Sequence, residues 1–254
     1  MVLSEVEAGG IMKADKGLTE DTISIQYKFT FSDKSVREFN VRLDGETLSL
    51  IRRERSSVPD WTRLSYRKCP NCPLSDKLHP NCPIALNLVE VVEFFKNSIS
   101  YEEVDVEIIT EARNYLKHSD LQTAISSLIG IFMVTSGCPV MDKLRPMVKT
   151  HLPFATPEET IYRILSMYLL AQYFVCKDGQ KPDWELQNLQ EIYEQVQIVN
   201  KSFCQRLSEI HIKDASLNAV VSLDSFASLT TFSLELNQLD RVKHLFHAYL
   251  NSNG

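Results

Sequence analysis

The sequence predicts an α+β protein with an N-terminal antiparallel β-meander, a Cys-Pro-rich metal loop and a C-terminal α-helical array. Three observations lead to this fold class. Residues 22–31 alternate between apolar and polar side chains, which is typical of a half-buried strand. Residues 52–83 hold five of the ten prolines, which excludes a regular helix or a central strand there. Beyond residue 84, apolar side chains recur with the period of helices.

The expected sheet has three or four strands. After the first strand, residues 39–43 alternate again, and the Asp-Gly pair at 44–45 is a strong signal for a two-residue hairpin turn. Residues 46–51 are expected to continue as a third strand, and residues 103–110 to return to the sheet as a fourth. We therefore expect an antiparallel sheet with one apolar face.

Beyond residue 84, the chain is expected to contain about five or six helices. Residues 121–134 carry no charged side chain, which predicts a central helix. The apolar stripe of residues 184–210 permits, but does not require, contact with a protein partner or a second copy of the chain. The expected helices cover residues 86–95, 121–134, 158–175, 184–210, 217–232 and 239–250.

These elements divide the chain into three parts. Residues 1–20 are expected to form a flexible N-terminal arm. Residues 21–110 form the sheet, with one helix and an inserted metal-binding loop at residues 60–83, because a loop of that length needs a function that organises it. Residues 111–254 form a helical domain packed on the sheet.

The composition is that of a globular protein. With 44% hydrophobic and 24% charged residues and a net charge of -6, the chain is neither generally disordered nor collagen-like. Its longest apolar stretches fall short of the ~20 residues that span a bilayer, so no membrane association is expected. The first residues lack the apolar region of a secretory signal, which predicts a cytoplasmic protein with reduced cysteines.

Four of the six cysteines share an unusual feature, because each is followed directly by proline. These are Cys69, Cys72, Cys82 and Cys138. Cys69 and Cys72 have the C-x2-C spacing that lets two thiolates bind one metal from a single tight turn. Proline after each cysteine stiffens the chain and lowers the entropy lost when the ligands are ordered. The sequence therefore predicts a metal site.

Two ligand sets fit this pattern. The favoured set contains all four cysteines, and the other replaces Cys138 with His79, which lies three residues before Cys82. In the first set, His79 is an alternate ligand or a hydrogen-bonding neighbour of the ligands. Zinc is favoured over a four-iron, four-sulfur cluster because it is the commoner occupant of such a scattered site in a cytosolic protein. The metal is then expected to staple the loop to the helical half, in a structural, interaction or regulatory role.

A reactive thiol is the first alternative to a metal site. Cys138 precedes Pro139 at the expected start of a helix, where the helix dipole lowers a thiol pKa. His151 is a candidate base for it, and together they give an iron–sulfur or thiol redox protein as the second hypothesis. No standard catalytic motif is present, which favours a non-enzymatic role.

Nucleic-acid binding is the second alternative. The stretch from Arg52 to Lys68 includes Arg53 and Arg55 and interleaves basic residues with Trp61 and Tyr66, a pattern found in proteins that bind single strands. The overall acidic charge argues against an extended phosphate-binding surface. Nucleic acid therefore stays open as an unfavoured partner.

Several long strings of the sequence are unusual, namely CPNCPL, HPNCPIALNLVE, MVTSGCPVMDKLRPM, HLPFAT and MYLLAQYF. At these strings the chain resembles a bacterial family of uncharacterised proteins of about this length, from the meander through the helical half. The resemblance implies no known activity. It implies a bacterial cytoplasmic protein, and within it the four Cys-Pro cysteines are the positions of interest.

Overall fold

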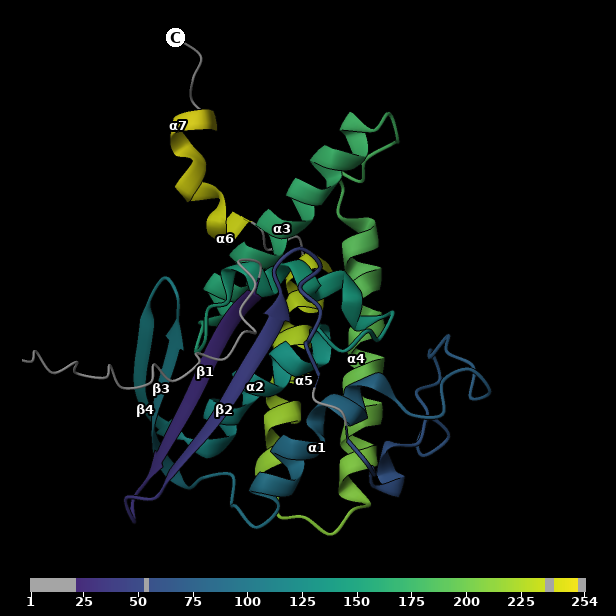
Figure 1. Ribbon diagram of the computed structural model, residues 1–254. Coiled ribbons are helices and arrows are strands. Elements are labelled where there is room, and N and C mark those ends of the chain that lie inside the picture. The colour runs from purple at the N-terminus through teal and green to yellow at the C-terminus, as the bar shows by residue number, and fades with distance from the viewer. Residues whose placement is uncertain (1–21, 53–54, 236–239, 251–254) are drawn as a thin grey trace, which may run out of the picture.

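The computed structural model describes residues 22–52, 55–235 and 240–250, and it confirms the predicted α+β class. An antiparallel sheet near the N-terminus is followed by a helical half that packs against it (Figure 1). The expected arm at residues 1–20 and the side chain of Arg53 lie outside the described residues.

The sheet contains four strands in the order β2-β1-β3-β4, and every neighbouring pair is antiparallel. The strands are β1 (Thr22–Phe31), β2 (Val36–Asp44), β3 (Glu103–Thr110) and β4 (Asn114–Asp120). The alternation predicted for β1 is confirmed, since Ile25, Tyr27 and Phe29 are buried on one face. Tyr27 pairs with Phe39 of β2 on one side and with Ile108 of β3 on the other, so the central strand carries the apolar face across the sheet.

The third strand expected at residues 46–51 is not formed. The Asp44 carboxylate accepts hydrogen bonds from the backbone N–H and the hydroxyl of Thr47, at 2.7 and 2.8 Å, and these bonds turn the chain at the end of β2. Beyond the turn, only Leu50 pairs with β2, through an isolated bridge to Leu43. The segment instead contacts the helical half, as described below.

The sheet extends further along the chain than the boundary predicted at residue 110. Strand β4 was expected to belong to the helical half, because its sequence NYLKHSD shows no apolar alternation. It forms an edge strand whose side chains are exposed or half-buried, so burial imposes no pattern on them. Immediately after it, the Asp120 carboxylate accepts a hydrogen bond from the Thr123 N–H and caps the next helix.

The helices follow the predicted order, with ends shifted by a few residues. They are α1 (Pro83–Phe95), α2 (Leu121–Val134), α3 (Pro157–Lys177), α4 (Gln187–Ser208), α5 (Ala215–Glu235), α6 (Asp240–Lys243) and α7 (His247–Leu250). Three 3₁₀ segments complete the described elements: η1 (Asp60–Thr62), η2 (Met141–Thr150) and η3 (His244–Phe246). The single helix expected at residues 239–250 is thus divided into three short pieces.

Helices α1 and α2 lie against the sheet, α5 packs behind α2, and α4 packs against α5 (Figure 1). The apolar stripe of α4 faces this interior, and its members Leu189, Val196, Val199, Phe203 and Leu207 are all buried. The stripe is therefore part of the core of this chain. Within the described residues, no helix combines the length and apolar character needed to cross a bilayer.

Candidate metal centre

The four Cys-Pro cysteines, which come from three separate segments, line one small cavity of about 20 Å³. Cys69 and Cys72 lie in the loop before α1, Cys82 is the residue just before that helix, and Cys138 lies between α2 and η2. The fold thus brings Cys138 to the local cysteines across more than fifty residues of sequence.

The C-x2-C segment forms a tight turn that is held on α4. The Cys72 N–H donates to the Cys69 carbonyl at 3.0 Å, which closes the turn. Between them, the Asn71 side-chain amide donates to the carbonyl and to the side-chain oxygen of Gln195, at 3.0 and 2.9 Å. The turn is therefore oriented by hydrogen bonds as well as by its prolines.

The two ends of the loop are joined by a short antiparallel contact. The Cys82 N–H donates to the Thr62 carbonyl at 2.7 Å, and the Leu64 N–H donates to the Pro80 carbonyl at 2.9 Å. These two bonds bring Cys82 back to the start of the loop and bury it at the cavity.

Arg206 of α4 is the residue that sequence reasoning missed. Its side chain is 2% exposed, and its guanidinium donates to the backbone carbonyls of Trp61, Arg63 and Arg67 at 2.6, 2.9 and 3.3 Å. It also lines the cysteine cavity. A signal was present, because Arg206 lies three residues after Phe203 and so interrupts the apolar stripe with a charge.

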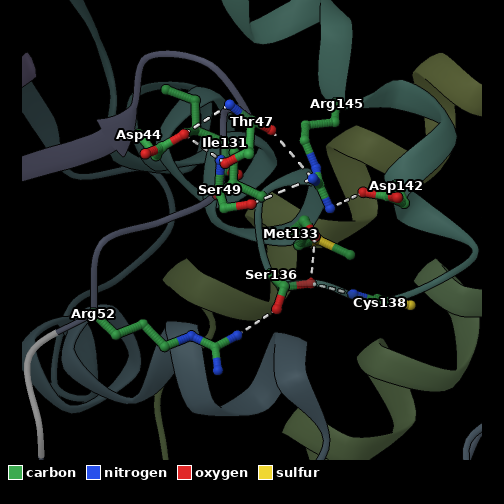
Figure 2. A network of polar contacts seen from close by, with 11 residues as sticks. Asp44, Thr47, Ser49, Arg52, Ile131, Met133, Ser136, Cys138, Asp142 and Arg145 are labelled. Atoms are coloured by element: carbon green, nitrogen blue, oxygen red, sulfur yellow. Dashed lines mark hydrogen bonds and ion pairs between the residues drawn. The ribbon is translucent and has the colours of Figure 1, made fainter. Parts of the chain in front are cut away.

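Figure 2 shows how the segment that carries Cys138 is fixed to the end of the sheet. The Cys138 N–H donates to the Ser136 hydroxyl at 3.1 Å, and that hydroxyl donates to the Met133 carbonyl at 2.7 Å. The Arg52 guanidinium donates to the Ser136 carbonyl, and Arg145 binds the turn after β2. Both sides of the Cys138 turn are thus tied to elements outside the helical half.

Burial dominates the electrostatics of these thiols. Burial, together with repulsion from neighbouring cysteine thiolates, raises the pKa of Cys69 to about 11. Burial also raises the pKa of Cys82 and of Cys138. The thiols of Cys69, Cys82 and Cys138 are therefore protonated at neutral pH when no cation is bound.

Three groups partly offset this burial by favouring the thiolates. Backbone N–H groups at the start of α1 lower the pKa of Cys82, and so does the charge of Arg206. Backbone N–H groups of Val140 and Met141 lower the pKa of Cys138. The cavity therefore has donors directed at sulfur, although without a cation they do not overcome the desolvation.

The structure does not bring together the candidate nucleophile and its candidate base. Cys138 lines the cysteine cavity, whereas His151 lies past the far end of η2, lines a different cavity and is 2.6 Å from the Tyr27 hydroxyl. The chain around Cys138 turns before the 3₁₀ segment begins at Met141, so Cys138 is not the cap of a regular α-helix. With its raised pKa, Cys138 lacks the thiolate character of a reactive cysteine.

His79 is exposed and lines a neighbouring hollow of about 310 Å³, together with Arg52 and Ser136. It does not line the cysteine cavity, although Leu74 and Pro83 border both spaces. This placement favours Cys138 over His79 as the fourth member of the cysteine set.

Among the described residues, the basic side chains of the candidate nucleic-acid surface bind other parts of this chain. Their partners are the Ser136 carbonyl for Arg52, Glu90 for Arg55, Asp60 for Arg63, Glu209 for Arg67, and Asp76 for Lys68. The Trp61 side chain is buried, so it offers no surface for stacking on a base.

The cysteine side chains form no disulfide bonds. All six cysteines are free, and no group of three or more His, Cys, Asp or Glu side chains within residues 22–52, 55–235 and 240–250 is arranged to hold a metal ion. Cys176 is exposed and Cys204 is half-buried, and neither lines the cavity.

The fold and this site define an α+β protein with a cluster of four cysteines, two of them buried and two half-buried. Residues 25–247 match the family described as Domain of unknown function (DUF6901), and the chain belongs to that family. Membership of a family without an assigned activity is thereby confirmed, while the bacterial source remains a prediction. No curated protein and no solved structure matches the chain.

Proposed function

We propose that this protein binds one zinc ion through Cys69, Cys72, Cys82 and Cys138, and that the ion joins the proline-rich loop to the helical half. The observation that carries the proposal is that four thiols from three segments border one small space. Four cysteines are a common ligand set of structural zinc sites, which have no open coordination position. The role is therefore structural, supporting an interaction or regulatory surface in the cytoplasm, rather than catalytic.

The surrounding charges suit such a complex. Zinc with four thiolates carries a net charge of about -2, which needs compensation in a buried place. The Arg206 guanidinium borders the cavity, and backbone N–H groups favour the thiolates of Cys82 and Cys138. Hydrogen bonds to ligand atoms of this kind orient the ligands and tune the metal.

The size of the cavity favours zinc over the alternative cluster. A space of about 20 Å³ is of the order needed for one small ion or one water molecule. A four-iron cluster carries four irons and four sulfides between its cysteines and requires a larger opening. Zinc requires only that the thiols lose their protons and rotate toward a common centre about 2.3 Å from each sulfur.

The test is titration of the reduced protein with cobalt(II), followed by competition with zinc. We expect about one cobalt per chain, with the visible bands of a tetrahedral thiolate complex and their loss on adding zinc. Cys82→Ser is expected to weaken the binding about 100-fold or more, because it removes a ligand. His79→Ala is expected to leave the spectrum unchanged.

Cys204→Ser is the matched control, since Cys204 is partly buried, has a raised pKa of about 11 and does not line the cavity. Metal removal by a chelator is expected to speed hydrogen exchange in residues 60–83 while leaving α5 unchanged. If Cys69→Ser and Cys82→Ser keep the wild-type melting temperature with and without chelator, the proposal is wrong. A brown protein containing iron and sulfide would instead support the redox alternative.

A further inference from the structure

Another, much larger cavity lies in the helical half, away from the cysteines. It has a volume of about 570 Å³, is partly open, and is lined mainly by α2, η2, α3, α4 and α5. Its lining is mostly apolar, with Ile131, Leu144 and Leu223 on three of these elements. This volume is within the range of roughly 300–1,000 Å³ that is typical of small-molecule sites.

The titratable side chains that line this cavity are basic or neutral. They are Lys117, His151, Arg163 and the phenol of Tyr193, and no Asp or Glu is among the described lining residues. Glu159 is the carboxylate that acts on Arg163, but it lies outside the lining and accepts a hydrogen bond from the Thr156 N–H at 2.8 Å. Because burial lowers the pKa of His151 to about 3 and Lys117 is exposed, Arg163 is the inner positive charge. The nearby carboxylates are Glu159 and Asp224, the latter bonded to Asn200.

Arg163, which lines this cavity, has a hydrogen-bond donor without a partner among the described residues. One of its terminal nitrogens donates to the Met147 carbonyl at 2.9 Å, whereas its buried Nε has no hydrogen-bond partner among the described residues. A buried donor without a partner costs free energy, and a guanidinium binds a carboxylate through two parallel N–H groups. An oxyanion is one acceptor that would supply the missing partner and match the charge of the guanidinium.

Other polar groups of the lining come from the facing helix α4. Asn200 is 2% exposed and its side-chain oxygen has no partner among the described residues, while Tyr193 is 4% exposed. Arg163 acts electrostatically on Tyr193 and on His151, which places these three groups near one another. A few convergent polar groups in an otherwise apolar cavity are what orient a bound small molecule.

We propose that this cavity binds an amphipathic monocarboxylate, with its carboxylate at Arg163 and its apolar body among the aliphatic side chains of α2, η2 and α5. The carboxylate supplies the partner that Arg163 Nε lacks, and the apolar body fills the remaining volume. Lys117 is exposed at the border of the cavity and attracts an anion toward it. This site does not depend on the zinc proposal, because none of the four cysteines lines it.

Calorimetric titration of the full chain with octanoate tests this proposal. The comparison ligands are 1-octanol and octylammonium, which have the same chain length. We expect octanoate to bind at least about tenfold more tightly than octanol, because a hydrogen bond to a charged group adds about that factor, and octylammonium not to bind. A parallel titration with naphthalene-2-carboxylate shows whether the site prefers a flexible chain or a rigid ring system.

Two variants and one control locate the site. Arg163→Met is expected to weaken octanoate about 10- to 100-fold and to leave octanol unchanged. Ala155→Trp, at a half-buried lining position, is expected to block both ligands by occupying the opening. Lys177→Met, on the same helix as Arg163 but outside the lining, is the control and should bind octanoate as the wild type does.

Methionine-methyl NMR gives a readout that does not depend on affinity. Octanoate is expected to shift the signals of Met141 and Met147, which line the cavity, and to leave that of Met167 unchanged. The proposal is overturned if octanol binds as tightly as octanoate, if Arg163→Met binds octanoate as well as the wild type does, or if no ligand shifts these two signals.

Discussion

Arg206 and Arg163 lie on consecutive helices, and both guanidiniums border a cavity, but their hydrogen bonds differ. Arg206 borders a space of about 20 Å³ and donates to three backbone carbonyls of the cysteine loop. Arg163 borders a space of about 570 Å³, donates to one carbonyl and keeps a buried Nε without a partner among the described residues.

The difference separates a structural site from a ligand site. A buried guanidinium whose donors are used by the backbone holds a segment in place, and its removal leaves several carbonyls unsatisfied. A half-buried guanidinium whose buried Nε is an unused donor beside open volume carries a desolvation penalty that a ligand can offset. Replacing Arg206 should therefore lower the free energy of unfolding strongly. Replacing Arg163 should instead weaken ligand binding and change the free energy of unfolding little.

The largest expected effect on stability is that of Arg206→Met. The change removes three hydrogen bonds and leaves the carbonyls of the loop buried, so we expect the free energy of unfolding to fall by about 3–5 kcal/mol. Urea denaturation in the presence of a chelator measures the effect without the metal. Arg67→Met is the control, because its exposed ion pair with Glu209 is expected to contribute about 0–1 kcal/mol. An Arg206→Met protein within 1 kcal/mol of wild type, in the same range as this control, would contradict the structural role.

An intermediate effect on stability is expected from the protonation of His151. The size of this effect tests how strongly the larger cavity excludes water. Burial lowers the pKa of His151 from 6.5 to about 3, so the unfolded chain binds a proton below pH 6.5 that the folded protein does not. Stability from this residue is thus complete above pH 6.5 and falls by up to about 1.4 kcal/mol per pH unit as the pH decreases toward 3.

Urea denaturation of the wild type and of His151→Gln between pH 7.5 and 5 measures the His151 contribution, because the two proteins share every other titrating group. We expect the wild type to lose more stability than the variant below pH 6.5. Parallel pH curves for the two proteins would show that the His151 side chain is hydrated.

The smallest effect is expected from Arg163→Met in the absence of any ligand. Losing the bond to the Met147 carbonyl and removing the desolvated charge oppose each other, so the free energy of unfolding should stay within about 1 kcal/mol of wild type. The same urea protocol provides the measurement. A loss as large as that of Arg206→Met would mean that Arg163 is structural and would remove the contrast between the two sites.

The sequence predicted those parts of the fold that depend on neighbouring residues. Alternation located β1, the uncharged segment located α2 at Leu121–Val134, and apolar periodicity located α3, α4 and α5 within a few residues. The prediction from sequence failed at residues 46–51, where a hydrogen bond from the Thr47 N–H to the Asp44 carboxylate forms a turn instead of a strand. It also failed at β4, because an edge strand needs no alternation of apolar side chains. Both failures occur where solvent exposure weakens the link between sequence pattern and structure.

For the candidate sites, the sequence by itself singled out Cys69, Cys72, Cys82 and Cys138 by their local Cys-Pro pairs and C-x2-C spacing, and it left open whether Cys138 or His79 is the fourth member. Only the tertiary structure decided that Cys138 rather than His79 borders their cavity, and that Arg206 joins them from α4. It also decided that Arg163, His151 and Asn200 border one large apolar space. Local periodicity reflects interactions within a few residues. The residues that border each cavity come from distant segments, and their proximity depends on the packing of α3, α4 and η2, which no short pattern encodes.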